Sequence, residues 1–395
     1  MEEVNENIET IELEELNEEL IIASRNGSYN EVKKLLDKGA DFGYQDAQGV
    51  TPLMRAAEGG YAEVVSLLLE HGAPWNSQDE DGYCAGEYAI GNKHDDVLDI
   101  ILEHAVRCEL ILGALTRRLS ASQPAQPTSD YLNQKLIYRD NQLIDADGEA
   151  VMMGWETPLM LKHAELICRN GGVIMNVGFG LGIIDTAIQS YPNITQHVII
   201  EAHPDVYEHM VQNGWKEKPN VRIMFGRWQE MIPILEQEGV KFDGIFFDTY
   251  GEYYEEMREF HQHVPGLLRK KSEEEGGQKN EEENKETKGD EVAKNDSNGV
   301  YSFFNGLASD NIFFHMVYCR LIQLELARWG VQTSYERVDV EALGDDVWAG
   351  VRNKYWHFET YFLPTCVLGS EEDDNEEGEG EEGGEEEEGE EEEGE

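Results

Sequence analysis

Short apolar runs alternate with amphipathic segments through the middle of the chain. Residues 171–182 (GGVIMNVGFGLG), 197–203 (HVIIEAH) and 242–250 (FDGIFFDTY) have the length and apolar content of buried strands, and residues 181–191 and 205–215 between them read as helices. Strands that alternate with helices predict βαβ units and a parallel sheet. We therefore expect an α/β, Rossmann-like domain in this part of the chain.

The apolar pattern stops at residues 269–298 and then resumes. The interrupting stretch has almost no apolar residue, so we expect a disordered insertion. After it, VYSFFN (300–305) reads as a strand, residues 310–329 as a helix, and residues 331–340 and 355–368 as two late strands. Two consecutive strands at the end of such a domain predict an antiparallel edge on the mostly parallel sheet.

The first hundred residues follow a repeat of 33 residues instead, and the clearest unit spans residues 46–73. Pro52 is placed to open a first helix, the VVSLLL run gives a second helix its apolar face, and Gly72 ends that helix. The unit resembles the ankyrin repeat, with Thr51-Pro52-Leu53-Met54 in place of the T-P-L-H of that family. The third unit has lost the Thr-Pro pair at residues 84–87, which favours a terminal repeat that docks on another part of the molecule. A recognition surface and a passive spacer both remain open for this all-α region.

These patterns divide the chain into segments. Two prolines with Ser, Gln and Thr at residues 121–130 have the composition of a linker between domains. We expect an acidic tail (1–16), ankyrin repeats (17–117), the linker (118–130), the α/β domain (131–369) with its insertion (269–298), and an acidic disordered tail (370–395).

The formal net charge of −51 narrows the choice of partners. Residues 371–395 carry 18 acids, and removing them still leaves about −33. A field of this sign repels phosphate backbones and anionic lipids but attracts basic proteins at range, an attraction that salt weakens. We therefore expect a basic protein partner, with no direct nucleic-acid or membrane binding.

The cysteines and the N-terminal sequence indicate the cellular compartment in which we expect the protein. Five widely spaced cysteines without a CxxC pair suggest neither a disulfide framework nor a zinc site. The N-terminus lacks the basic and apolar regions of a signal peptide, and no run reaches about 18 apolar residues. We expect a soluble protein of the cytoplasm and nucleus.

The chemistry-bearing residues follow the predicted strands. Glycines at 178, 180 and 182 let backbone N–H groups approach a ligand, which in a Rossmann-like fold is a dinucleotide or S-adenosylmethionine. Glu201 ends the next strand, about 20 residues on, where a carboxylate accepts both ribose hydroxyls. Trp228 after the third strand is placed either against an adenine face or as the core anchor of a helix start. Asp248 ends the fourth strand, where an acid can hold a nucleophile.

Several of these stretches together resemble guanidinoacetate methyltransferase. The matching runs are WETP (155–158), GFG (178–180), IIEAH (199–203), GRWQ (226–229) and FDGIFFDTY (242–250). Ankyrin repeats joined to such a domain resemble the fungal type IV protein arginine methyltransferases, which methylate the internal δ nitrogen (N5) of arginine. The resemblance implies a class I methyltransferase fold, S-adenosylmethionine as cofactor, and a ribosomal large-subunit protein as substrate.

The resemblance also implies site residues. Glu156 and Asp248 correspond to the two acids that bind the guanidinium in the guanidinoacetate enzyme, and Asp248 is expected to accept or relay a proton. Tyr131 is also open to interpretation as a packing residue, and Asn176 replaces the acid common at its position. Together with the glycine loop, the donor contacts expected are Tyr131, Met152, Gly178, Phe179, Gly180, Leu181, Gly182, Ile183, Glu201, Ala202, His203, Trp228, Gln229 and Asp248.

A metal site is not expected. His261 and His263, with Glu252, Glu255 and Glu256, read as one solvated helix face. Two further functions stay open beside protein arginine methylation. One is methylation of a small guanidino compound such as guanidinoacetate, and the other is an ankyrin scaffold with an inactive methyltransferase-like domain.

Overall fold

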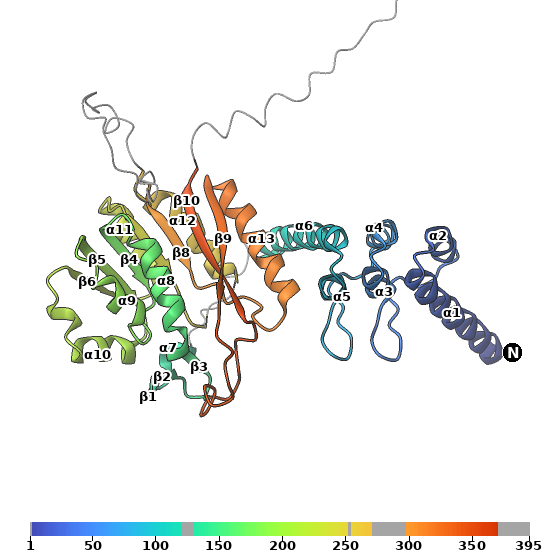
Figure 1. The fold of residues 1–395 in the computed structure, drawn as a ribbon, viewed down its shortest axis with the longest axis horizontal. Helices are drawn as coiled ribbons and strands as arrows, with labels where there is room; N and C mark the ends of the chain where they lie inside the picture. The colour runs from blue at the N-terminus through green and yellow to red at the C-terminus, as the bar shows by residue number, and fades with distance from the viewer. Residues whose placement is uncertain (1, 121–129, 252–253, 271–297, 370–395) are drawn as a thin grey trace, which may run out of the picture.

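The structure is a computed structural model that describes residues 2–120, 130–251, 254–270 and 298–369. It has two parts, a row of helix pairs and an α/β domain. They meet where the long helix of residues 95–120 packs against the helix of residues 312–328 (Figure 1). The expected fold class is confirmed. Ankyrin repeats come first, and a methyltransferase-type domain with a mostly parallel seven-stranded sheet and an antiparallel edge follows them.

Helices α1 to α6 form three pairs in the N-terminal part. The loops between successive pairs extend from one side of the row (Figure 1). Buried Leu, Val and Ala side chains of all three pairs form one continuous core. The helices are α1 (Glu2–Arg25), α2 (Tyr29–Asp37), α3 (Pro52–Glu58), α4 (Ala62–Glu70), α5 (Ala85–Asn92) and α6 (Asp95–Ser120).

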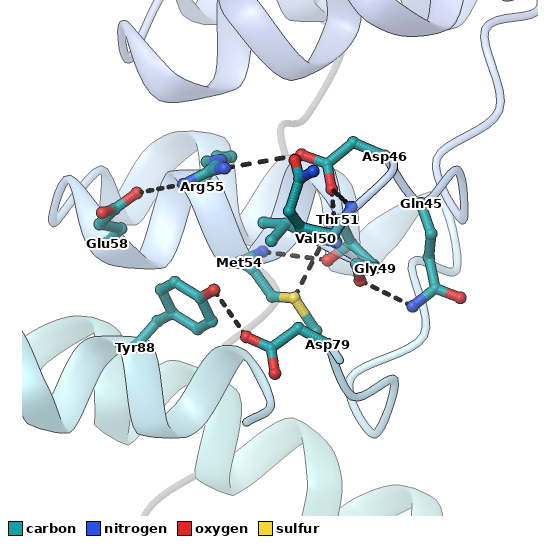
Figure 2. Close-up of polar contacts among 11 residues, drawn as sticks. Gln45, Asp46, Gly49, Val50, Thr51, Met54, Arg55, Glu58, Asp79 and Tyr88 are labelled. Atoms are coloured by element: carbon teal, nitrogen blue, oxygen red, sulfur yellow. Dashed lines mark hydrogen bonds and ion pairs between the residues drawn. The ribbon is translucent and has the colours of Figure 1, made fainter. Parts of the chain in front are cut away.

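The second repeat shows why its Thr-Pro pair matters (Figure 2). Pro52 opens α3, and the Thr51 side chain accepts the Met54 N–H at 3.1 Å, which satisfies one of the free donors of the first helical turn. Upstream, the Asp46 carboxylate accepts the Val50 N–H at 2.9 Å and lies 3.5 Å from Arg55. The loop and the helix are thus tied together by one carboxylate.

Seven strands form the main sheet, in the order β6-β5-β4-β7-β8-β10-β9. The first five are parallel, and β10 runs antiparallel to both β8 and β9. The strands are β4 (Gly172–Val177), β5 (Ile194–Glu201), β6 (Val221–Phe225), β7 (Gly244–Phe247), β8 (Val300–Phe303), β9 (Val331–Asp339) and β10 (Thr360–Leu368).

Helices cover both faces of this sheet. Successive strand residues alternate between the faces, so that Ile174 packs with α8 to α10 and Met175 packs with α11 to α13. The helices are α8 (Thr157–Ile167), α9 (Ile183–Ile188), α10 (Pro204–Gln212), α11 (Trp228–Gln237), α12 (Tyr254–Leu267) and α13 (Ile312–Arg328), with a 3-10 turn η2 at Trp215–Glu217.

A small antiparallel sheet precedes the main one and was not anticipated, because its strands have only three or four residues. The β9–β10 connection (residues 340–359) reaches across to this small sheet. The Arg352 N–H donates to the Gly148 carbonyl at 2.7 Å, and the Gln142 amide donates to the Val347 carbonyl at 3.3 Å. The elements here are α7 (Asp130–Asn133), β1 (Ile137–Arg139), β2 (Gln142–Ile144), β3 (Ala150–Met153) and η1 (Gly154–Glu156).

The segment boundaries differ from the expectation at two places. The residues expected as an N-terminal tail are helical, since α1 begins at Glu2. Helix α6 continues to Ser120, past the expected start of the linker. The predicted disorder of 271–297 and 370–395, the middle of the linker (121–129) and the position of Glu252 lie outside the described residues.

The prediction that His261 lies on a solvated face is wrong. This side chain is fully buried on α12, with ring centroids 5.5 Å from those of Tyr301 and Phe303. Neither ring nitrogen has a hydrogen-bond partner in the described part of the chain. Burial, with a smaller contribution from Arg258, lowers the pKa of His261 to about 3, so the imidazole is neutral in the fold.

Replacing His261 by leucine should make the protein less sensitive to acid. The folded pKa lies below the unfolded value, so this group adds nothing above about pH 6.5 and destabilises progressively as pH falls toward the folded value. We expect His261→Leu to change the free energy of unfolding at pH 7 by less than about 1 kcal/mol. Between pH 7 and pH 5 the variant should lose about 2 kcal/mol less than the wild type.

Urea unfolding of the full chain at both pH values makes this measurement. The matched control is His263→Leu, because His263 lies two residues along the same helix and keeps a partly exposed side chain. Equal loss of stability in His261→Leu and the wild type on acidification would contradict a buried neutral imidazole.

Candidate active site

A cavity of about 360 Å³ opens at the carboxyl ends of β4 to β8. Its size is that of a small-molecule site, and the edge of a parallel sheet where the strand order reverses is the usual ligand position in this architecture. The strand β4 lies between β5 and β7, so the turn after β4 sits at that reversal.

The glycine loop after β4, residues 178–182, contributes Gly178 and Gly180 to the cavity wall. Gly178 has φ 94°, and a Cβ placed on it would lie 1.8 Å from the Asp248 carbonyl oxygen. Gly180 has φ 54°, and its Cβ would lie 2.6 Å from the Met152 sulfur. Glycine is therefore required here, because the backbone turns in the left-handed region and packs against both neighbours.

Asn176, near the end of β4, stabilises this loop through its side-chain amide. Its amide donates to the Gly178 carbonyl at 2.8 Å and to the Asp185 carboxylate at 2.9 Å, and the side chains of Asn176 and Asp185 are fully buried. Asp185 also lies 3.1 Å from the fully buried His197. The amide at the position where related folds carry an acid thus holds the loop rather than facing the cavity.

Glu201 ends β5 at the cavity wall, where it was predicted. One carboxylate oxygen accepts the Phe179 N–H at 2.9 Å and the other accepts the His203 N–H at 2.6 Å. Burial raises the pKa of Glu201, and the backbone donors oppose that effect. A carboxylate has about four acceptor positions, so the backbone N–H groups of Phe179, Ala202 and His203 leave at least one for a ligand hydroxyl group. The glycine cradle and this carboxylate together fit the ribose end of S-adenosylmethionine.

Glu156, in η1, also lines the cavity. It is only 3% exposed, and its Oε1 accepts both the Met153 N–H at 2.8 Å and the Tyr355 hydroxyl at 2.5 Å. Within the described residues neither bond involves Oε2, which leaves that oxygen for a ligand. Burial, and then repulsion from Asp248, raise the pKa of Glu156 to about 8.

Asp248 lines the same cavity and completes the acidic pair. It follows β7 directly, and its N–H donates to the Val177 carbonyl at 2.9 Å. Burial raises the pKa of Asp248 to about 7. Three acids and one basic residue, Arg227, line the described wall, so the cavity favours a cationic ligand.

Tyr355 is a site residue that sequence reasoning missed. It comes from the β9–β10 connection, 199 residues after Glu156 in the chain, and no local motif marks it. Other lining residues were not among the predicted site residues. They are Leu132, Val206, Thr249, Tyr250, Met257, Phe304, Gly306 and Leu307.

Most of the predicted site residues line the cavity. Trp228 also lines the cavity. Its ring is buried, with its centroid 5.4 Å from that of Phe260 and 6.0 Å from that of Phe247, so it packs as a core residue at the start of α11. The residues found on the wall are Tyr131, Met152, Glu156, Gly178, Phe179, Gly180, Glu201, Ala202, Trp228, Gln229 and Asp248.

Four predicted contacts lie behind the wall instead. Gly182 and Ile183 belong to the start of α9, and the Leu181 N–H points to the Met152 sulfur at 3.3 Å. His203 caps α10, and its ring lies 4.9 Å from that of Tyr131. Leu181, Gly182, Ile183 and His203 therefore contact residues of the cavity wall but do not line the cavity themselves.

The described residues form neither a metal-binding cluster nor a membrane-spanning helix. No group of three or more His, Cys, Asp or Glu side chains there has a geometry that could hold a metal ion. None of the helices in the same residues combines the length and apolar character needed to cross a membrane.

The fold and the cavity define a methyltransferase-type domain that follows ankyrin repeats. Comparison with known families agrees with this class. The guanidinoacetate N-methyltransferase family matches residues 125–275, and a family of three ankyrin repeats matches residues 20–111.

Curated relatives carry the name protein arginine N-methyltransferase 2. The protein from Yarrowia lipolytica is 38% identical over 251 residues, which cover 60% of this chain and 47% of the relative. The proteins from Aspergillus oryzae and Candida glabrata are 37% and 38% identical, over 62% and 59% of this chain and 52% and 51% of their own lengths. The chain thus spans about half the length of the curated relatives it matches.

The buried acids should reduce stability at alkaline pH. The folded pKa of Glu156, about 8, is above the ordinary 4.5, so its contribution to stability is complete below pH 4.5 and is lost as pH rises through 8. Glutamine stays neutral and keeps an oxygen for both donors. We expect Glu156→Gln to raise the free energy of unfolding at pH 9 by on the order of 2 kcal/mol, and to change it little at pH 5.

Denaturant unfolding at pH 5 and pH 9 tests this expectation. The control is Glu165→Gln, an exposed position on α8, which should behave like the wild type at both values. A Glu156→Gln protein that is less stable than the wild type at pH 9 would show that the carboxylate is stabilising there.

Proposed function

We propose that this protein transfers a methyl group from S-adenosylmethionine to the δ nitrogen (N5) of an arginine in a basic protein, with a ribosomal large-subunit protein as the substrate. The observation that carries the proposal is the pairing of Glu156 and Asp248 in the cavity that the glycine loop and Glu201 also line. The relatives named protein arginine N-methyltransferase 2 support arginine as the acceptor.

The acidic pair selects a guanidinium. A buried carboxylate is costly unless a cation pairs with it, and arginine stays protonated at any physiological pH. Its planar fork of N–H donors matches carboxylate oxygens, and Glu156 keeps Oε2 for such a contact. At about 4 Å and an effective dielectric of about 20, each charge contact is worth roughly 4 kcal/mol before desolvation.

The same pair prepares the nucleophile. When bound, S-adenosylmethionine supplies a methyl group on a positively charged sulfur. Carboxylates that hold the two outer nitrogens draw positive charge toward them and leave the δ nitrogen facing the donor side. Holding the reacting atoms about 3 to 3.5 Å apart supplies much of the rate. Asp248, which follows β7 beside the glycine loop, accepts or relays the proton that the nitrogen loses.

Replacing either acid should abolish transfer but spare donor binding. Glu156→Gln and Asp248→Asn remove the charge that holds the acceptor, and we expect kcat/KM to fall by at least about 100-fold. The Kd for S-adenosylmethionine should change less than about threefold, because the ribose contact at Glu201 is intact. Glu165→Gln on the surface of α8 is the matched control and should be fully active.

The acceptor is identified by incubating each protein with labelled donor, a cytosolic extract and free guanidinoacetate, followed by fragmentation mass spectrometry. Label on the δ nitrogen of a protein arginine supports the proposal. Label on a terminal nitrogen overturns the N5 assignment, and label on guanidinoacetate favours the small-molecule alternative, which the match to that family supports. If no acceptor is labelled, the result favours the remaining alternative, an ankyrin scaffold with an inactive methyltransferase-like domain.

The rate should also depend on pH in a defined direction. Only the ionised pair binds a guanidinium, and the pKa values of Asp248 and Glu156 are raised to about 7 and about 8. We therefore expect kcat/KM for the acceptor to rise between pH 6 and pH 8.5 while the donor Kd stays nearly constant. Stopped initial-rate assays over this range measure it, and a profile that falls with pH would exclude a role for ionised carboxylates.

A further inference from the structure

The third ankyrin repeat shares a hydrophobic core with the α/β domain. Phe313, in the first turn of α13, is fully buried and belongs to the ankyrin core. A Cβ placed on Gly86 of α5 would lie 2.1 Å from Cδ2 of this ring, and the Trp75 ring lies 6.2 Å from it. Phe313 therefore occupies the space that a side chain at residue 86 would need.

A polar contact locks the two helix starts together. The Asn311 amide donates to Oε2 of Glu87 at 2.7 Å, and the same Glu87 oxygen accepts the Cys84 N–H at 3.0 Å at the start of α5. The Oδ1 of Asn311 accepts the Phe314 N–H at 2.9 Å and so caps α13. Each helix start is thus satisfied by a residue that also contacts the other domain.

The start of α13 continues directly into the cavity wall. The loop before it contains Gly306 and Leu307, which line the cavity. Buried His315 lies in the next turn, and its Nδ1 is 2.7 Å from the Leu307 carbonyl oxygen. A carbonyl oxygen only accepts, so Nδ1 carries the proton of this hydrogen bond, and burial lowers the pKa of His315. The position of the loop therefore depends on the position of α13.

The same loop holds the segment that delivers Tyr355. The Ser309 hydroxyl donates to the Tyr355 carbonyl, and the His357 N–H donates to the Ser309 carbonyl at 3.2 Å. The Tyr355 hydroxyl in turn donates to Glu156. An unbroken series of contacts thus runs from the third ankyrin repeat to the acceptor carboxylate.

We infer that the third ankyrin repeat positions the acceptor side of the cavity, with Gly86 and Glu87 as positioning residues. The donor side rests on the glycine loop and Glu201, which have no part in this series of contacts. The two sides should therefore respond differently when the repeat is disturbed. The inference about the acceptor rests on the proposed function, whereas the inference about the loop does not.

The test compares Gly86→Ala with Gly91→Ala in the full chain. Both glycines lie in α5, so both alanines bring the same gain in helix propensity. A Cβ on Gly91 meets nothing within 4 Å, whereas a Cβ on Gly86 displaces Phe313. Hydrogen exchange of amides 304–311 is measured by mass spectrometry, together with methyl transfer kinetics and the donor Kd.

We expect Gly86→Ala to speed exchange at 304–311 by at least about fivefold and to lower kcat/KM for the acceptor by about 5- to 30-fold, with the donor Kd unchanged. Gly91→Ala should match the wild type. Adding Phe313→Leu to Gly86→Ala should restore most of both losses, because the smaller side chain makes room. General destabilisation would not be rescued by a second core truncation.

Asn311→Asp gives an independent readout that does not disturb the core. Aspartate keeps the cap on α13 but sets a carboxylate against Glu87, so it should reproduce the effect of Gly86→Ala on exchange and on kcat/KM. The inference is overturned if exchange at 304–311 in Gly86→Ala and Asn311→Asp equals that in Gly91→Ala. If exchange changes but no protein transfers methyl groups, the proposed function fails and the positioning of the loop stands.

Discussion

The burial of two carboxylates beside one another is the constraint on which the rest of this site depends. Glu156 and Asp248 share a cavity, burial raises the pKa of both, and repulsion from Asp248 raises the pKa of Glu156 further. An arrangement of this kind is unfavourable in an empty cavity and persists only because the surrounding structure fixes it. The buried pair therefore lowers the stability of the fold, a cost that a bound cation would offset.

The elements that fix the two acids come from distant parts of the chain. Asp248 follows β7, and its carbonyl packs against Gly178, so the donor loop and this acid are positioned together. Glu156 is held by its own 3-10 turn and by Tyr355 from the β9–β10 connection. That connection is itself tied to the small sheet by backbone bonds such as Arg352 to Gly148. Asp248 is thus positioned together with the glycine loop, whereas Glu156 depends on its own turn and on the β9–β10 connection.

Local patterns were sufficient to predict the main sheet and the strand ends that meet at the cavity. Apolar strand periodicity, the glycine loop and an acid at a strand end are signals within one short stretch, and the rule that parallel strand ends meet at one edge brings Glu201 and Asp248 together. Tyr355 could not be found this way, because its role arises from a contact between residues 199 apart. Burial of His261 was missed since a histidine among glutamates on a helix looks solvated until the neighbouring strand β8 is in place.

The union of the two domains follows from a similar long-range contact. A repeat array needs a polar cap at each end unless its last unit is covered by something else. Here Phe313 covers the third repeat, and only a residue without a side chain at position 86 leaves room for that ring. The loss of the Thr-Pro pair at residues 84–87 is consistent with this, since Glu87 takes over the capping of α5 and also holds Asn311. The array therefore ends on the α/β domain rather than on a linker, and the contact that terminates one domain also sets the wall of the cavity in the other.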